Sequence, residues 1–168
     1  MKGLVLGVAL SLSACGAEPP DGGVHALQPL AIDDHEGAVC GMVVREQSAP
    51  RAQVVHRDGH RAFLCSIGDL LAYLRVPSPH GTPEAVLVEV MDPSEDPLEI
   101  HLAPHPWLAA ADAVFVVGIA RRSIMGEPVL VYRTLDDAAQ VIVGRNARVL
   151  RFTELERWWL DLEEEGYP

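Results

Sequence analysis

The sequence is poor in basic residues and in cysteine. Lys2 is its only lysine, and 13 lysines and arginines stand against 24 acidic residues, which gives a formal net charge of −11. This charge disfavours nucleic acids and anionic lipid surfaces as partners, because both repel a negatively charged protein. It is compatible with gathering cations or with docking on a basic partner.

Signatures of catalysis are also missing. The chain has no glycine-rich phosphate loop, no HExxH zinc helix and no serine with nucleophile-elbow spacing. Asp69 follows an expected helix start and is interpreted as a capping or surface residue. The tryptophans Trp107, Trp158 and Trp159 fit core or partner contacts better than stacking on nucleic-acid bases. We therefore expect a binding protein and not an enzyme.

The N-terminus has the features of an export signal. Lys2 is followed by a short apolar run from Gly3 to Leu12, which is too short to span a bilayer. Leu12-Ser13-Ala14-Cys15 resembles a lipobox, so residues 1–15 are predicted to be a lipoprotein signal peptide with a lipidated Cys15. The alternative is an ordinary signal peptide that contains a cysteine. The first interpretation predicts anchoring on the periplasmic side of a bacterial membrane.

The rest of the chain divides into a tether and one domain. Residues 16–33 are rich in proline and glycine and are expected to form a flexible tether. Residues 34–168 can build one domain with its own core. The pattern predicts strands and helices in this domain. The expected strands are 37–44, 53–56, 61–65, 85–91, 98–102, 113–117, 126–132 and 147–152. Residues 107–112 are expected as a helical turn, and helices are expected from Ile67 to the prolines at 77 and 79, over 135–144 and over 153–165.

The order of these elements suggests an internal repeat of secondary structure. Two strands and a short helix occur around 37–74, and two strands, a short helix and a strand occur around 113–152. The order of elements therefore predicts an α+β fold, with two small ββα units packed together, a terminal helix and a site between the units.

Sulfur-bearing residues mark the candidate site. Cys40-Gly41-Met42 places a thiol and a thioether two residues apart, where an extended strand would point both the same way. A second motif, Met125-Gly126, lies far downstream. Soft sulfur ligands select Cu(I), so Cys40, Met42 and Met125 are the candidate metal ligands. If Cys15 carries lipid, Cys65 is the only other thiol, and a Cys40–Cys65 disulfide stays open as an alternative.

Three histidines and a further methionine lie outside these sulfur motifs. His35, close to Cys40, is either an accessory ligand or part of a solvated loop. His101 and His105 are expected to be loop histidines, although they could bind Cu(II) as a loose pair. Met91 lies in a valine-rich segment and is expected in the core.

Taken in order, these motifs resemble the NosL family of copper chaperone lipoproteins. The resemblance rests on the lipobox, Val39-Cys40-Gly41-Met42, the Phe63–Leu74 segment, His105-Pro106-Trp107, Met125-Gly126-Glu127-Pro128 and the Arg148–Phe152 segment. It implies a protein that holds Cu(I) through Cys40, Met42 and Met125. The implied recipients are the membrane-bound ABC-type maturation complex of nitrous oxide reductase, or the reductase itself. It also implies paired ββαβ units similar to the accessory fold of organomercurial lyase. Cys65 departs from the family pattern, in which an acidic or polar residue is common.

Two rival functions remain. One is a thiol-dependent redox or lyase-type enzyme that uses Cys40 and Cys65, although the chain lacks CxxC spacing. The other is a structural lipoprotein whose sulfur atoms are simply buried.

Overall fold

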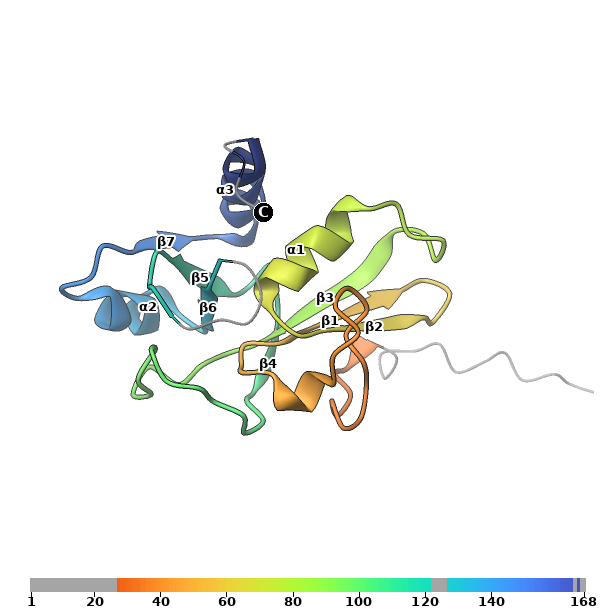
Figure 1. Cartoon of the computed structure of the whole chain (residues 1–168), viewed down its shortest axis with the longest axis horizontal. Helices are drawn as coiled ribbons and strands as arrows, with labels where there is room; N and C mark the ends of the chain where they lie inside the picture. Colours follow the sequence, from red (N-terminus) through yellow and green to blue (C-terminus); the bar gives the residue numbers. More distant parts are fainter. Residues whose placement is uncertain (1–26, 122–126, 165, 167–168) are drawn as a thin grey trace, which may run out of the picture.

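The computed structural model describes residues 27–121, 127–164 and 166. Within this part of the chain, three helices pack with two antiparallel sheets (Figure 1). Cys15 and the expected signal peptide lie outside the described residues. In the described part, no helix is both long and apolar enough to cross a membrane.

The first sheet is built by the N-terminal half of the domain. Its elements are β1 (Ala52–His56), β2 (Arg61–Leu64), α1 (Ile67–Arg75), β3 (Pro83–Glu89) and β4 (Trp107–Ala109). The strand order is β2-β1-β3-β4, and all neighbours are antiparallel. Gly59, with a φ of 85°, makes the turn between β1 and β2, as the Asp-Gly pair predicts. Ser66 caps α1 by accepting a hydrogen bond from the Asp69 backbone amide.

The second sheet repeats this topology. Its elements are β5 (Val114–Val117), β6 (Val129–Tyr132), α2 (Leu135–Ile142) and β7 (Arg148–Leu150). The order β6-β5-β7 matches β2-β1-β3, again with antiparallel neighbours. Both halves are therefore ββαβ units, and α3 (Phe152–Glu164) follows the second. The predicted α+β fold of two such units with a terminal helix is confirmed.

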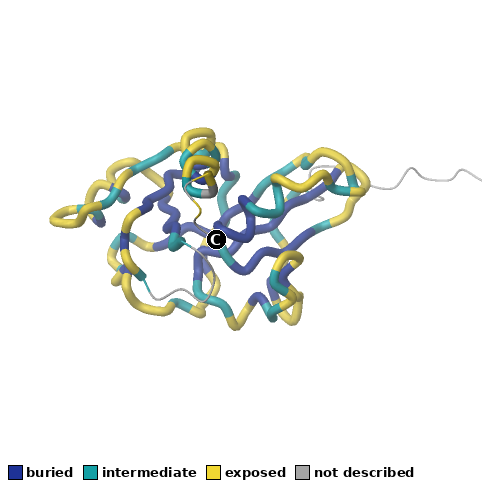
Figure 2. Tube along the Cα trace, turned by 45° about the horizontal axis from the view of Figure 1, so that its top comes forward, coloured by how far each residue is buried: buried dark blue, intermediate teal, exposed yellow. Residues whose placement is uncertain are grey.

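The two units share one hydrophobic core. The largest cluster of buried side chains joins Leu64 and Leu70 of the first unit to Phe115 and Val131 of the second, and adds Leu155 from α3. Helix α1 contacts β1 and β2 of its own sheet and also β6 of the other. Figure 2 shows the buried stretches running through the centre of the molecule, with the exposed stretches in the outer loops.

A second cluster of buried residues fills the space beneath α2. It contains Val114, Leu130 and Ala138, and also Met91, which is 4% exposed. The prediction that Met91 belongs to the core is confirmed. Trp159 is buried in the larger cluster, which agrees with a core role for at least one tryptophan.

Three local predictions were wrong. Residues 37–44 do not form a strand: residues 38–40 are a turn, and Val44–Glu46 form a short 3₁₀ helix. Residues 98–102 form a loop because their polar backbone groups bond across to the segment before β1; the Ala49 amide, for example, donates to the His101 carbonyl at 2.8 Å. Residues Trp107–Ala109 form the edge strand β4 and not a helical turn, because they pair with β3.

The last residues of the segment expected as a tether lie against the domain. The backbone of Leu30 exchanges two hydrogen bonds with the Gln53 side chain, at 3.0 and 2.7 Å, and Ile32 is 8% exposed. Arg61 also donates to the Gln28 carbonyl at 2.8 Å. Contact with the domain therefore begins several residues before position 34.

A buried ion pair joins the strands of the first sheet. Arg51 Nε and Glu89 Oε2 are 2.5 Å apart, Arg51 Nη2 and Glu89 Oε1 are 2.9 Å apart, and the side chains are 0% and 1% exposed. The remaining guanidinium donors reach the carbonyls of Gln47, Leu102 and Ala103. The pair therefore fixes the loop that precedes β4 against the start of β1.

Candidate metal centre

Cys40 lies in a tight turn and not on a strand. The Gly41 amide donates to the Gly37 carbonyl at 2.7 Å, and the Gly37 amide donates to the Met42 carbonyl at 2.8 Å. Gly41 has a φ of 69°, a conformation that glycine adopts without the strain of a side chain. The turn leaves Cys40 only half buried. The thiol is therefore presented by a loop that the rest of the domain holds in place.

Cys65 meets Cys40 at this turn. It follows the last residue of β2, is 2% exposed, and its Sγ lies 3.2 Å from Cys40 Sγ. Both cysteines are free thiols, so the structure holds no Cys40–Cys65 disulfide. The Cys65 thiol also donates to the Met42 carbonyl at 3.7 Å. Two chain segments that are 25 residues apart thus bring two sulfur atoms together.

The approach of the two thiols depends on Gly37. A Cβ atom at this position would lie 2.6 Å from Cys65 Sγ and 2.8 Å from Cys40 Sγ. Real Cβ atoms do not come this close to sulfur, so a side chain at position 37 would displace the thiols. The missing side chain of Gly37 therefore makes the space in which the two sulfur atoms meet.

Asp69 adds a buried carboxylate to this group. It lies in the first turn of α1, is 5% exposed, and its Oδ2 has no hydrogen-bond partner among the described residues. One of its carboxylate oxygens lies within 4.8 Å of both cysteine sulfurs. The prediction that Asp69 is a capping or surface residue was wrong. Its backbone amide takes part in the cap, while its side chain is buried beside the thiols.

Burial governs the electrostatics of these groups. Desolvation raises the pKa of the Cys65 thiol above its ordinary value, and the hydrogen bond and charge of Cys40 act in the same direction. Desolvation also raises the pKa of Asp69, against hydrogen bonds from the Cys40 thiol, the Cys65 backbone and Ser66. Burial therefore shifts both groups toward their protonated forms. A bound cation would favour the charged forms.

Met42 and His35 lie beside the thiols. Met42 is partly buried and packs with Cys40 against a small cluster that contains Phe63 and Cys65. The His35 ring is stacked on Phe63, with ring centroids 3.8 Å apart and an interplanar angle of 8°. His35 itself is exposed. The structure thus brings together Cys40 and Met42 of the predicted ligands and leaves His35 at the rim.

Met125 lies outside the described residues. Its described neighbours in the chain, Arg121 and Glu127, line a cavity of about 250 Å³ that Cys65 and Ser66 also line. Arg121 is held there because its guanidinium donates to the Ala49 carbonyl at 2.8 Å and also contacts the Ser48 hydroxyl. The described residues on either side of positions 122–126 therefore lie at the cavity next to Cys65.

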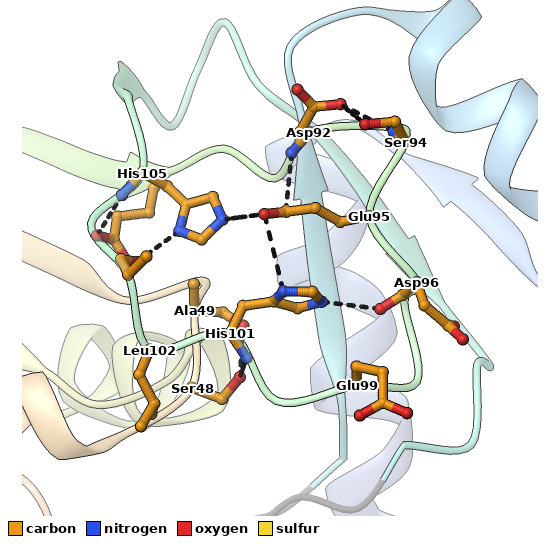
Figure 3. Close-up of polar contacts among 12 residues, drawn as sticks. Ser48, Ala49, Asp92, Ser94, Glu95, Asp96, Glu99, His101, Leu102 and His105 are labelled. Atoms are coloured by element: carbon orange, nitrogen blue, oxygen red, sulfur yellow. Dashed lines mark hydrogen bonds and ion pairs between the residues drawn. The ribbon is translucent and has the colours of Figure 1, made fainter.

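His101 and His105 are engaged with a carboxylate (Figure 3). Both oxygens of Glu95 lie 3.0 Å from His105 Nε2, and Oε1 lies 3.7 Å from His101 Nδ1. The other ring nitrogens bond to backbone carbonyls, those of Ala103 and Asp96, each at 2.8 Å. These contacts hold the loop 92–105 in place. Both histidines therefore lie in a loop, as expected. In the described residues, the grouping suited to a metal ion is that of Cys40, Cys65 and Asp69.

Known proteins resemble this chain over most of its length. The profile of the family described as NosL matches residues 29–160. The chain is 28% identical to the copper-binding lipoprotein NosL of Stutzerimonas stutzeri over 158 residues, which cover 92% of this chain and 80% of the relative. It is 30% identical to the copper-binding lipoprotein NosL of Achromobacter cycloclastes over 122 residues, which cover 71% of this chain and 62% of that relative.

A solved structure is similar in fold as well. The crystal structure of the copper chaperone NosL from Shewanella denitrificans superimposes with a TM-score of 0.61 at 28% sequence identity, covering 76% of this chain and 95% of the other. The family profile spans both ββαβ units and includes the turn that carries Cys40 and Met42. The chain belongs to the NosL family.

Proposed function

We propose that this protein is a copper chaperone that binds one Cu(I) ion and passes it on. The observation that carries the proposal is the half-exposed Cys40 thiol, set beside Met42 in an apolar cluster. A thiolate supplies charge and thioethers supply soft donors, which together suit Cu(I). The relatives named copper-binding lipoprotein and copper chaperone support the same conclusion.

The proposed ligands are Cys40, Met42 and Met125, with His35 as an accessory group at the rim. Cys40 and Met42 come from one turn, and Met125 belongs to a segment whose described neighbours line the cavity next to Cys65. Ligands from two segments can exchange one at a time, and this allows Cu(I) to move to a partner without being released into water.

The proposed setting is the periplasmic side of a bacterial membrane, with Cys15 as the lipid anchor. The names of the two lipoprotein relatives support the anchor. The proposed recipients are the ABC-type complex that matures nitrous oxide reductase, or the reductase itself. An anchor of this kind would keep the chaperone near a membrane-bound recipient. Replacing Cys15 with serine and following the protein in membrane and soluble fractions tests this part separately.

An anaerobic Cu(I) titration against a competing chelator tests the copper proposal. The full chain, purified from membranes in detergent, should bind one Cu(I) tightly. Cys40→Ser should abolish tight binding, while Met42→Ala and Met125→Ala should each weaken it. Met91→Leu is the matched control, because Met91 is a buried methionine of the second core cluster. Absence of a tight site, or a tight site that ignores all three ligand changes, would refute the proposal.

A thiol redox enzyme is the second candidate, and the 3.2 Å between the Cys40 and Cys65 sulfurs favours it. In that reaction the two thiols would become a disulfide and pass two electrons and two protons to the disulfide of a partner protein. Turnover with a model disulfide substrate, lost in Cys65→Ser, would support this candidate. A protein that binds Cu(I) tightly and shows no turnover would exclude it.

A further inference from the structure

We propose that Cys65 binds the metal as a second thiolate together with Cys40, and that the buried Asp69 carboxylate lies within reach of the same ion. This inference rests on the proposed function, because it assigns a further ligand to the same Cu(I) site. Neither residue belongs to the Cys-Gly-Met or Met-Gly motif on which the proposed function rests.

The two sulfurs lie close enough to bind one ion after a small separation. They are 3.2 Å apart, and all three candidate ligand atoms lie within 4.8 Å of one another. With metal–sulfur bonds of about 2.3 Å, as in zinc thiolates, two sulfurs on one ion are separated by roughly 3.8 Å in tetrahedral geometry and about 4.6 Å in linear geometry. Metal entry thus requires the sulfurs to separate by about 0.6 Å or more. Cys40 can supply this movement, because it lies in a half-exposed turn.

Asp69 supplies an independent reason to place a cation here. Its side chain is buried, yet Oδ2 has no hydrogen-bond partner among the described residues. Buried polar atoms nearly always have a partner, and an unmet one requires an explanation. A cation held between the thiolates would be within reach of this carboxylate. The same ion would then satisfy the oxygen that the protein leaves unpaired.

The surrounding elements hold Cys65 and Asp69 in place. Cys65 directly follows β2, and Asp69 lies in the first turn of α1, where Ser66 caps the helix. The positive end of the helix dipole therefore faces the negatively charged ligands. This positive potential offsets part of the charge that a second thiolate adds.

The test counts sulfur ligands directly. X-ray absorption on the Cu(I)-loaded full chain should show four sulfur ligands in wild-type protein, two of them the Met42 and Met125 thioethers, and three in Cys65→Ser. Cu(I) affinity, measured by chelator competition, should fall by about 10- to 100-fold in Cys65→Ser, and by a smaller factor in Asp69→Asn. Met91→Leu is the matched control, because it alters a buried residue of the second core cluster and removes no proposed ligand.

The outcomes separate this inference from the copper proposal. Three sulfur ligands in wild-type protein, and a Cys65→Ser variant of unchanged affinity, would overturn the inference while leaving Cys40 as the copper ligand. No tight Cu(I) site in wild-type protein would overturn both. Because the sulfur count of the wild type needs no substitution, the test holds even if Cys65→Ser folds poorly. Cys65→Ala is the second variant, and it should lose the same sulfur.

Discussion

Gly37 is the single residue on which the contact between the two thiols depends. Replacing it with alanine should destabilise the protein by about 1–3 kcal/mol, because the new methyl group overlaps both sulfurs. Urea unfolding measures the change. In a Cys65→Ala background the nearer sulfur is gone, so the same replacement should cost less. A cost that is equal in both backgrounds would show that the methyl group does not meet Cys65.

The pH dependence of folding stability tests the burial of the Tyr132 phenol. Tyr132 is 1% exposed, and burial raises the pKa of its phenol from 10.0 to about 12. Between these values the unfolded chain loses the proton and the folded chain keeps it, so proton loss favours unfolding and stability falls as pH rises. The full effect corresponds to roughly 2–3 kcal/mol.

Comparison with Tyr132→Phe isolates this contribution, because the variant has no phenol to ionise. Unfolding free energies of the two proteins should run parallel below pH 10, and the wild type should lose stability relative to the variant between pH 10 and 12. Parallel curves over the whole range would contradict the burial of the Tyr132 hydroxyl.

For single residues, the sequence predicted which side chains could bind a metal better than it predicted where those side chains lie in the fold. Cys40 and Met42 were identified by the softness of their sulfur atoms, and the structure brings them together. Asp69 was misplaced, because its spacing after Ser66 fits a cap equally well whether its carboxylate faces water or the protein. Cys65 was left undecided, since nothing in the sequence states that β2 ends beside the turn 38–40.

The start of helix α2 is determined by a local signal, the capping box formed by Thr134 and Asp137. Thr134 accepts from the Asp137 amide at 3.1 Å, and the Asp137 carboxylate accepts from the Thr134 amide at 3.1 Å. Thr134→Ala should lower the free energy of unfolding by about 1 kcal/mol, because one orphan amide at the helix start loses its partner. Thermal or urea unfolding checks this value. The exposed Thr153 of α3 is the control, and its replacement by alanine should change stability by less than about 0.5 kcal/mol.

Among the elements, those with local signals were predicted and those defined by distant partners were not. The Asp-Gly turn before β2 and the caps of α1 and α2 are encoded within a few residues. By contrast, residues 98–102 alternate in a strand-like way but find no strand to pair with, and bond instead to Ser48 and Ala49. β4 exists because β3 offers an edge, which no nearby residue indicates.

The whole molecule should unfold as one unit, because its two sheets share a core. Leu155 of α3 is 0% exposed within that core. Leu155→Ala should destabilise the protein by about 2–5 kcal/mol. Far-ultraviolet circular dichroism and tryptophan fluorescence should still report one transition with a common midpoint. Two separated transitions would show that the ββαβ units unfold independently.

The topology of the whole molecule was predicted in part from the order of its elements, because two strands and a short helix occur twice along the chain, and the closing strand of each unit was implied by the family resemblance. The shared core could not be read in the same way. Burial of Phe115 and Leu64 in one cluster depends on how the sheets face each other, and both residues lie in runs that would suit separate cores equally well.

The buried pair of Arg51 and Glu89 limits how this chain can change over generations. Each side chain is fully enclosed, and each is the charged partner of the other. Losing either one leaves an uncompensated charge inside the protein, at a cost of about 3–5 kcal/mol, whereas apolar side chains at both positions can be tolerated. A lineage that replaces the pair must therefore pass through a poorly folded intermediate or change both codons together. Positions 51 and 89 are thus expected to change together during evolution.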